Sequence, residues 1–372
     1  MKNTTSRRAF TVAALLTALA APQIPAAAAA ARPAPAPAEL PAPATRAPIG
    51  TRTLHLVDSS RPDPWKPAAG HRELMVSLWY PAAVRHGARA PYVSKELSKK
   101  VLGIEAIADV RTHGLVNALP APGKRPLVVL SPGFGMSRAT LTGLGEDLAS
   151  RGYAVAAVDH TYEAPVEFPG GRIEDCLICD RLDLPVVQNR AKDISFVLDR
   201  LTAPGSGLVI DRKRVGVAGH SIGGASAVEV MREDPRVKAA VNMDGNFFTE
   251  PPAEGLARPV LLLGAQRGKL PEPRANWEHT WDRLTGWKRW LDVPDGGHLT
   301  FTDAPWLVDR FGLGDRIPPE AVPGAFGTLK QDRATALTRA YVSAFFDRHL
   351  RGARGTLLDG PSAAYPEVTF LR

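Results

Sequence analysis

The stretch Arg214-Val-Gly-Val-Ala-Gly-His-Ser-Ile-Gly-Gly-Ala225 decides the fold of this chain. Its first part, residues 215–218, is an apolar run that predicts a buried strand. A sharp turn follows at residues 219–223, and residues 225–232 favour a helix. The order strand, G-x-S-x-G, helix is typical of a nucleophile elbow, in which flanking glycines permit close packing. We therefore expect Ser221 at the carboxyl end of a strand; the alternative is a chance match to a common pattern.

Apolar runs and helix-forming segments alternate along the chain. The predicted strands are 51–57, 72–80, 126–130, 153–158, 215–218, 237–243, 259–263 and 288–293. The predicted helices are 140–151, 185–201, 225–232, 276–284 and 335–351. This alternation predicts an α/β fold with a mostly parallel central sheet and helices on both faces. Residues 94–119 are expected to be helical or partly irregular, and whether they form a lid stays open.

Length and charge narrow the class of protein. The chain has 372 residues, 44% of them hydrophobic, which is enough for one large α/β domain with extensions. The formal net charge of +8 is modest and not gathered in a long basic run, so nucleic-acid binding is not expected. Transient contact with an anionic lipid surface stays open.

The first 31 residues resemble a twin-arginine export signal. Arg7 and Arg8 precede an apolar run at 10–20, and the alanines at 26–31 offer cleavage sites. The run is short for a membrane span, which favours a removed signal over an uncleaved anchor. Residues 32–48 are mostly Pro and Ala and predict a disordered linker before a folded domain at 49–372. We therefore expect a secreted protein.

The chain has two cysteines, Cys176 and Cys179. A redox C-x-x-C site opens a helix after a strand, whereas this pair lies in a polar segment between predicted elements. In an exported chain we expect a structural disulfide, with two free thiols as the alternative. The sequence has no metal-binding spacing and no complete nucleotide-binding motif, so no cofactor and no metal are expected.

The proposed nucleophile needs a base, which is usually a histidine oriented by a carboxylate. His298 follows the last predicted strand in a Gly-Gly-His turn, which suits a base. Asp244 ends the strand at 237–243, whereas the strand at 259–263 ends without a carboxylate. Asp244 is therefore the predicted acid, although three aspartates lie nearer to His298 in sequence: Asp292, Asp295 and Asp303.

Two backbone N–H groups are predicted to form an oxyanion hole. One belongs to Phe134, between two glycines that follow the strand at 126–130, and the other to Ile222 in the elbow. Three further side chains are candidates for the substrate pocket: His160, Tyr162 and His220.

These residues resemble the plasma-type platelet-activating-factor acetylhydrolase family and its bacterial esterase and lipase relatives. The shared motifs are Trp79-Tyr80-Pro81, Ser131-Pro-Gly-Phe-Gly135, Ala157-Val-Asp-His160, Gly219-His-Ser-Ile-Gly-Gly224, Met243-Asp244, and Gly297-His298 through Phe301-Thr302-Asp303. The resemblance implies an α/β-hydrolase fold and calcium-independent hydrolysis of short or oxidised sn-2 acyl chains of phospholipids. It implies a Ser221, Asp244 and His298 triad, with Phe134 and Ile222 as oxyanion donors.

Two details qualify the resemblance. The spacing of 23 residues from Ser221 to Asp244 is similar to that family and argues against secreted cutinase-like polyesterases. Pro132 stands where the family often has histidine before the oxyanion loop, which leaves the acyl preference open.

The sequence therefore predicts a secreted serine esterase that forms an acyl-enzyme on a small-molecule or lipid ester. Short-acyl phospholipids or related lipid esters are the expected substrates. One alternative is a triacylglycerol lipase or a polyesterase-like or cutinase-like hydrolase with the same triad. Another is an inactive binding protein with the hydrolase fold. The sequence leaves the oligomeric state open.

Overall fold

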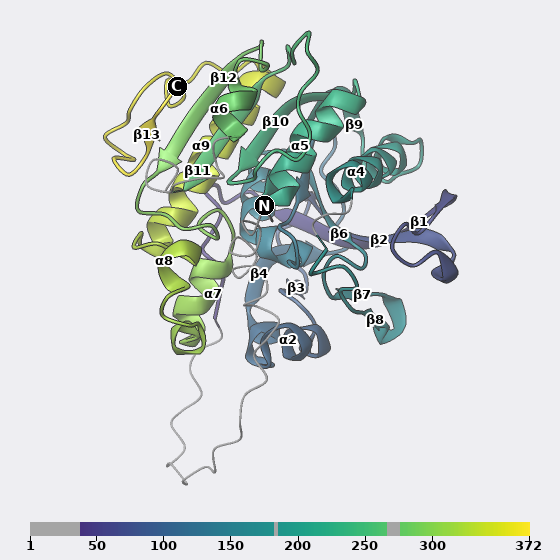
Figure 1. The fold of residues 1–372 in the computed structure, drawn as a ribbon. Helices are drawn as coiled ribbons and strands as arrows, with labels where there is room; N and C mark the ends of the chain where they lie inside the picture. The colour runs from purple at the N-terminus through teal and green to yellow at the C-terminus, as the bar shows by residue number, and fades with distance from the viewer. Residues whose placement is uncertain (1–37, 182–184, 266–275) are drawn as a thin grey trace, which may run out of the picture.

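One large twisted sheet carries the structure (Figure 1). The computed structural model describes residues 38–181, 185–265 and 276–372. The sheet has eleven strands in the order β13-β12-β11-β10-β9-β5-β6-β2-β1-β4-β3. Its central strands run parallel and are β6 (Ala154–His160), β5 (Arg125–Ser131), β9 (Ile210–His220), β10 (Val237–Met243), β11 (Val260–Ala265) and β12 (Lys288–Val293).

The sheet extends on both sides of this parallel centre through antiparallel pairs and, between β1 and β4, a parallel one. The long strands β1 (Ile49–Pro62) and β2 (His71–Pro81) pair with each other, and β2 pairs with β6. The outer strands are β4 (Arg111–Val116) and β3 (Arg89–Pro91) at one edge and β13 (Thr369–Phe370) at the other. A separate hairpin is formed by β7 (Val166–Glu167) and β8 (Ile173–Glu174).

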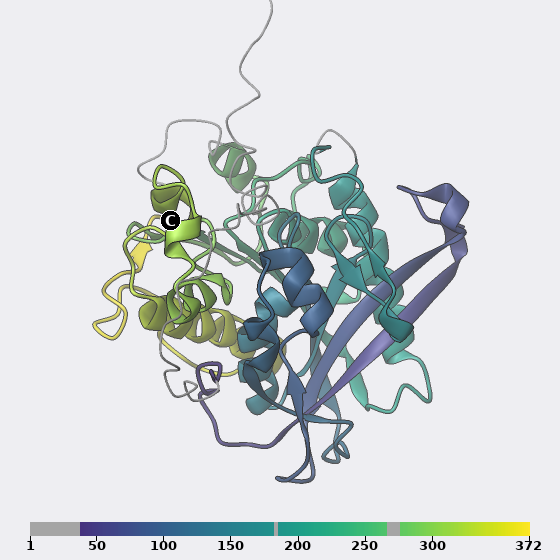
Figure 2. The same cartoon turned by 90° about the horizontal axis from the view of Figure 1, so that it is seen from below.

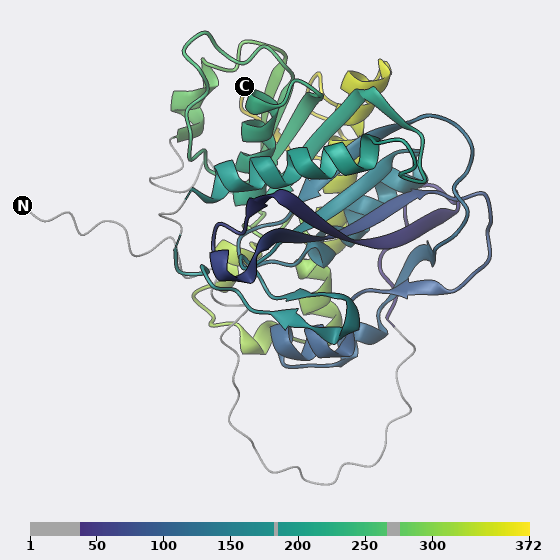
Figure 3. The same cartoon turned by 90° about the vertical axis from the view of Figure 1, so that its right-hand side faces the viewer.

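Helices cover both faces of the sheet, because the central strands are apolar on both sides. The helices α3 (Thr142–Ser150) and α9 (Gln331–Arg351) pack on one face. The other face is covered by α4 (Val186–Thr202), α5 (Ile222–Glu233) and α6 (Asn276–Trp281). Figure 3 shows α4 in teal crossing in front of the sheet and α9 in yellow behind it. The predicted mostly parallel sheet with helices on both faces is confirmed.

Short segments lie beyond the ends of the parallel strands. They include α2 (Lys95–Leu102), α7 (Ala304–Phe311) and α8 (Val322–Ala325). In Figure 2, α2 in blue lies between the teal β7–β8 hairpin and the light-green α7 and α8. Short 3-10 helices lie in connections throughout the fold, at Pro67–Ala69, Ala106–Asp109, Arg138–Leu141, Pro169–Gly171 and Gly314–Arg316.

Residues 94–119 combine three elements: α2, a 3-10 helix and the strand β4. Ser94 caps α2 by accepting a hydrogen bond from the Leu97 N–H at 3.0 Å. The strand β4 belongs to the main sheet, and Ile107 packs in one apolar cluster with Leu307 of α7. This segment is therefore joined to the body of the domain by sheet pairing and by apolar contacts.

The linker prediction needs correction from residue 38 onward. The backbone of Leu40 and of Ala38 hydrogen-bonds with Arg111, at 3.0 and 2.8 Å. Leu40 is buried among apolar side chains from α7, and Arg339 donates to the carbonyls of Pro41 and Ala42. The expected disorder of residues 38–48 is wrong because Leu40 brings apolar surface that the domain buries. The signal at 1–31 and residues 32–37 lie outside the described residues.

No helix in the described part of the chain is both long and apolar enough to span a bilayer.

Candidate active site

The turn between β9 and α5 has the geometry of a nucleophile elbow. Ser221 has φ 55° and ψ −128°, which is a rare conformation for a residue with a side chain. A Cβ atom on Gly219 would lie 2.1 Å from the Gly223 carbonyl oxygen, and one on Gly223 would lie 2.1 Å from the Ser131 carbonyl oxygen. Only glycine fits at these two positions, so the predicted role of the flanking glycines is confirmed. The strained turn lifts Ser221 out of the strand.

Three side chains from separate strand ends form a hydrogen-bonded chain. His298 Nε2 lies 2.9 Å from Ser221 Oγ, and His298 Nδ1 lies 2.6 Å from Asp244 Oδ2. Ser221 follows β9, Asp244 follows β10, and His298 follows β12. Parallel strands bring their carboxyl ends to one edge of the sheet, which is why residues so far apart in sequence meet there. The structure therefore brings together all three residues of the predicted triad.

The hydrogen bonds define which atom carries each proton. Asp244 is fully buried, and its Oδ1 accepts a hydrogen bond from the Ala265 N–H at 3.0 Å. An ionised carboxylate only accepts hydrogen bonds, so the Nδ1–H of His298 donates to Oδ2. In the neutral ring Nε2 then accepts a hydrogen bond from the Ser221 hydroxyl. The side chain of His298 remains 23% exposed, so a substrate can approach it.

His220 holds the backbone of His298. Its ring is completely buried, and Nε2–H donates to the His298 carbonyl oxygen at 2.6 Å. The Gly324 carbonyl accepts from the His298 N–H at 2.8 Å. Burial, with the nearby His298 as a second cause, lowers the pKa of His220 to about 3. His220 is therefore neutral near pH 7, and its hydrogen bond fixes the backbone of His298.

The two predicted oxyanion donors lie beside each other. Phe134 and Ile222 pack in the same small apolar cluster, and the first turn of α5 touches the carbonyl oxygens of Ser131 and Pro132. The N–H of Ile222 is in the first turn of a helix, where no intrahelical acceptor is available. Among the described residues, neither N–H donates to a backbone oxygen. Both groups are therefore available to bind an oxyanion.

The three predicted pocket side chains are buried instead of lining an open pocket. His160, Tyr162 and His220 expose only 2%, 3% and 0% of their surface. His160 bonds Ser131 and Asp193, and His220 bonds the His298 backbone. The Tyr162 carbonyl accepts from two N–H groups of the cysteine segment. The pocket prediction is wrong for these side chains because all three are buried, and both histidine rings already bond protein groups.

The structure contains a second Ser–His–Asp arrangement that the sequence analysis missed. We call Ser131, His160 and Asp193 the buried triple, and Ser221, His298 and Asp244 the elbow triple. A signal did exist in the sequence: Arg190 and Asp193 stand three residues apart on the face of α4 that carries Val186, Ile194 and Val197. Charged residues on an apolar helix face indicate a buried ion pair.

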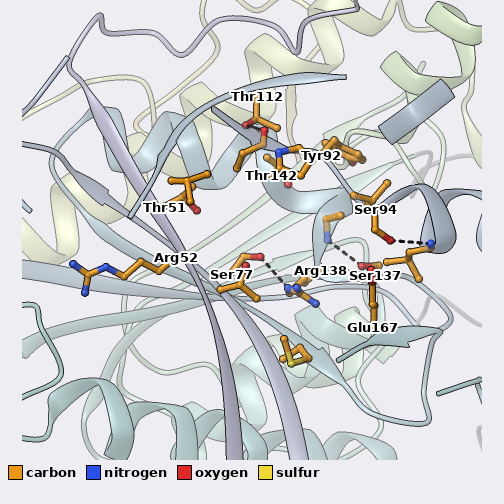
Figure 4. A pocket seen from close by; sticks show the side chains of 18 of the residues that line it. Thr51, Arg52, Ser77, Tyr92, Ser94, Thr112, Ser137, Arg138, Thr142 and Glu167 are labelled. Atoms are coloured by element: carbon orange, nitrogen blue, oxygen red, sulfur yellow. Dashed lines mark hydrogen bonds between the residues drawn. The ribbon is translucent and has the colours of Figure 1, made fainter. Parts of the chain in front are cut away.

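A cavity of about 500 Å³ lies apart from the elbow triple. Figure 4 shows side chains that line it. Its wall includes Arg138, which donates to Ser77 Oγ at 2.9 Å, and other polar and aromatic side chains: Thr112, Ser137, Thr142, Trp79 and Tyr92. None of the residues of the elbow triple lines it. Among the described residues, no three His, Cys, Asp or Glu side chains are grouped to hold a metal ion.

The predicted disulfide is confirmed, since Cys176 and Cys179 are bonded to each other. The loop between them donates from the N–H groups of Leu177 and Ile178 to the Tyr162 carbonyl, at 2.9 and 3.3 Å. The disulfide therefore closes a short loop that packs against the end of β6.

The sheet and the elbow geometry together define an α/β-hydrolase with the arrangement of a serine hydrolase. Residues 117–314, more than half of the chain, match the sequence profile of the PET hydrolase-like family, and the chain belongs to this family.

Several known proteins are similar to this chain. A solved ferulic acid esterase from Streptomyces cinnamoneus is 70% identical and superposes with a TM-score of 0.89, covering 91% of this chain and all of the other. A probable 1-alkyl-2-acetylglycerophosphocholine esterase of Arthroderma benhamiae is 29% identical over 86% of this chain and 90% of its own. The platelet-activating factor acetylhydrolase of Bos taurus is 25% identical over 68% of this chain and 63% of its own. The protein is therefore a carboxylic ester hydrolase.

These comparisons confirm the resemblance to the platelet-activating-factor acetylhydrolases. They also correct one argument. The spacing of Ser221 and Asp244 does not separate this chain from polyesterase-like hydrolases, because the matching family is PET hydrolase-like. The acid follows the strand next to the elbow strand, and the same sheet edge accommodates it there.

Proposed function

We propose that this protein is a secreted serine esterase that uses the elbow triple and hydrolyses esters of hydroxycinnamic acids such as ferulic acid. The hydrogen-bonded chain from Ser221 through His298 to Asp244 is the observation that supports the chemistry. The 70% identity to a ferulic acid esterase over its whole length supports the substrate class.

The reaction has two halves. Ser221 Oγ attacks the ester carbonyl carbon while His298 Nε2 takes its proton, and the carbonyl oxygen becomes an oxyanion. The N–H groups of Phe134 and Ile222 stabilise that charge. His298 then protonates the leaving alcohol, and an acyl-enzyme remains. Water attacks this ester with His298 again as base, the acid is released, and Ser221 regains its proton. Asp244 stabilises the imidazolium that forms in both halves.

A substrate comparison tests the proposed specificity. Methyl ferulate is expected to have a higher kcat/KM than an acetylated alkyl-glycerophosphocholine when both are assayed with the same purified protein. 4-Nitrophenyl acetate serves as a reference for the reactivity of Ser221, and the Ser221→Ala variant is the blank. A higher kcat/KM for the phospholipid would replace the proposed substrate class, while loss of activity in Ser221→Ala would still support the chemistry.

The phospholipid is the second candidate because the match to the glycerophosphocholine esterase extends along 86% of this chain. The lower identity, 29% against 70%, ranks it after the hydroxycinnamic esters.

Export is supported by the paired arginines before the apolar run. The native chain is expected in the culture medium, and the Arg7→Lys, Arg8→Lys double variant is expected to stay in the cells. Equal secretion of both would contradict twin-arginine export.

A further inference from the structure

The buried triple reproduces the hydrogen-bond order of the elbow triple in the interior of the domain. Ser131 Oγ lies 3.0 Å from His160 Nε2, and His160 Nδ1 lies 2.8 Å from Asp193 Oδ2. The exposed fractions of the three residues are 0%, 2% and 0%. A substrate cannot reach this serine, so the arrangement has another use.

The protonation of the buried triple follows from its charges. Arg72 donates to both oxygens of Asp193, at 3.1 and 2.7 Å. Burial by itself would raise the pKa of Asp193, but Arg72 and the bond from His160 hold it well below its ordinary range. Burial, with Arg190 nearby, lowers the pKa of His160. A neutral His160 then donates from Nδ1 to Asp193 and accepts a hydrogen bond from the Ser131 hydroxyl at Nε2.

This chain of bonds ends at the oxyanion turn, which we define as Pro132 to Gly135. Ser131 directly precedes the turn. Arg190 donates to the Pro132 carbonyl at 2.5 Å and to Glu163 Oε2 at 2.6 Å. The carbonyl oxygen of Glu163 accepts from the Gly135 N–H at 2.9 Å. Polar groups on both sides of Phe134 are therefore held by buried partners, while its own N–H has no backbone acceptor among the described residues.

The C-terminal end of the segment 131–138 is held by Asp159, the residue before His160. Asp159 Oδ1 accepts from the Arg138 N–H at 2.6 Å, and the Arg138 side chain also bonds Asp159. Two adjacent residues at the carboxyl end of β6, Asp159 and His160, thus hold the segment 131–138 at its two ends. Interiors are densely packed, so a change at either end is transmitted to the turn between them.

We infer that the buried triple, together with Arg190, is a positioning device that holds the oxyanion turn so that the Phe134 N–H faces the developing oxyanion. Ser131, His160 and Asp193 do not touch the substrate, and they act through the backbone of the turn. This inference rests on the proposed function, in which Ser221 forms the tetrahedral intermediate.

The test removes the Ser131 hydroxyl and measures transition-state binding. Ser131→Ala is expected to lower kcat for 4-nitrophenyl acetate on the order of tenfold, with KM within about twofold, because an oxyanion donor moves slightly out of place. The inhibition constant of phenylboronic acid, which forms a tetrahedral adduct with a reactive serine, is expected to rise by the same factor. Ser343→Ala is the matched control, since it removes a buried hydroxyl on α9 that bonds Asp147.

Assaying each variant at the same number of degrees below its own melting temperature separates an effect on positioning from an effect on stability. Unchanged kcat and unchanged boronate inhibition in Ser131→Ala would overturn the inference, and so would a rise in KM alone. His160→Gln and His160→Leu give a second reading if Ser131→Ala does not fold. The amide of glutamine can still accept from Ser131, so it is expected to retain more kcat than leucine, and equal kcat would contradict the inference. Boronate binding that survives in Ser221→Ala would instead contradict the proposed function.

Discussion

The elbow triple and the buried triple have the same residue types, the same sequence of hydrogen bonds and similar distances, and yet only the elbow triple has a serine that is partly exposed. The difference lies in the serine. Ser221 is in a strained turn with φ 55° beside a partly exposed histidine, whereas Ser131 is the last residue of an extended strand and is fully buried. A hydrogen-bonded Ser–His–Asp chain is therefore no nucleophile by itself; access and backbone geometry decide its use.

The histidines differ for the same reason. During catalysis a base must hold a proton for part of the cycle. His160 is buried beside the Arg190 guanidinium, and its lowered pKa disfavours protonation of the neutral ring to an imidazolium. His298 has its ring partly open and its Nδ1 on a buried carboxylate, which stabilises an imidazolium. The buried triple is thus suited to a fixed hydrogen-bond direction and the elbow triple to proton transfer.

The largest expected effect separates the two serines. Ser221→Ala is predicted to lower kcat by at least about 10⁴-fold, because the covalent route is lost. Ser131→Ala is predicted to lose only on the order of tenfold. Steady-state kinetics on 4-nitrophenyl acetate, with circular dichroism to establish folding, measures both. If Ser221→Ala kept more than about a hundredth of kcat, the assigned nucleophile would be wrong.

The two aspartates are expected to differ in stability. Asp193→Asn removes the carboxylate that accepts two hydrogen bonds from the buried Arg72, which then keeps Asp63 as its close anionic partner. We therefore predict a loss of about 3 kcal/mol in the free energy of unfolding, the low end of the cost of breaking a buried ion pair. Asp244→Asn should change this free energy by less than about 1 kcal/mol. Urea denaturation followed by fluorescence compares the variants. Equal stability of the two would remove the distinction between a structural and a catalytic carboxylate.

The activity of the same Asp244→Asn variant is expected to fall by at least about 10²-fold in kcat with KM little changed, because the imidazolium loses its stabilising charge. Asp295→Asn is the control, since Asp295 is an exposed turn residue near His298 in sequence. Kinetics on methyl ferulate or 4-nitrophenyl acetate checks this. Near-native kcat in Asp244→Asn together with a collapse in Asp295→Asn would refute the assignment of the acid.

The smallest expected effect concerns the disulfide beside the buried triple. The Cys176→Ser, Cys179→Ser variant opens a loop far shorter than 15 residues, so the loss of stability is predicted to stay below about 3 kcal/mol. Ile178 of this loop packs in one apolar cluster with Phe134 and Ile222, and opening the disulfide leaves that side chain in the chain, so kcat is expected to change less than in Ser131→Ala. Thermal unfolding and kinetics of the variant test both statements, and a larger drop in kcat than in Ser131→Ala would show that the loop supports the site.

Much of the catalytic arrangement was visible in the sequence. The elbow glycines, the strand end before Asp244 and the Gly-Gly-His turn predicted three side chains that meet within hydrogen-bond distance. Local patterns sufficed because Ser221 and Asp244 directly follow strands of a parallel sheet and His298 lies in the turn after another, and such a sheet gathers those ends at one edge. The strand at 288–293 was predicted with its observed bounds because its flanking turns are marked by glycine.

The surroundings of the site were decided by the tertiary structure. His160, Tyr162 and His220 stand near the motifs, but whether a side chain faces a pocket or the interior depends on packing between distant segments. The buried triple joins β5, β6 and α4, and no local pattern states that a helix residue such as Asp193 meets a histidine 33 residues earlier. By itself the sequence located the central strands and the turns after them to within a few residues, since hydrophobic runs and turns are local. Only the fold decided which of two Ser–His–Asp chains is accessible, because burial is a property of the whole packed domain.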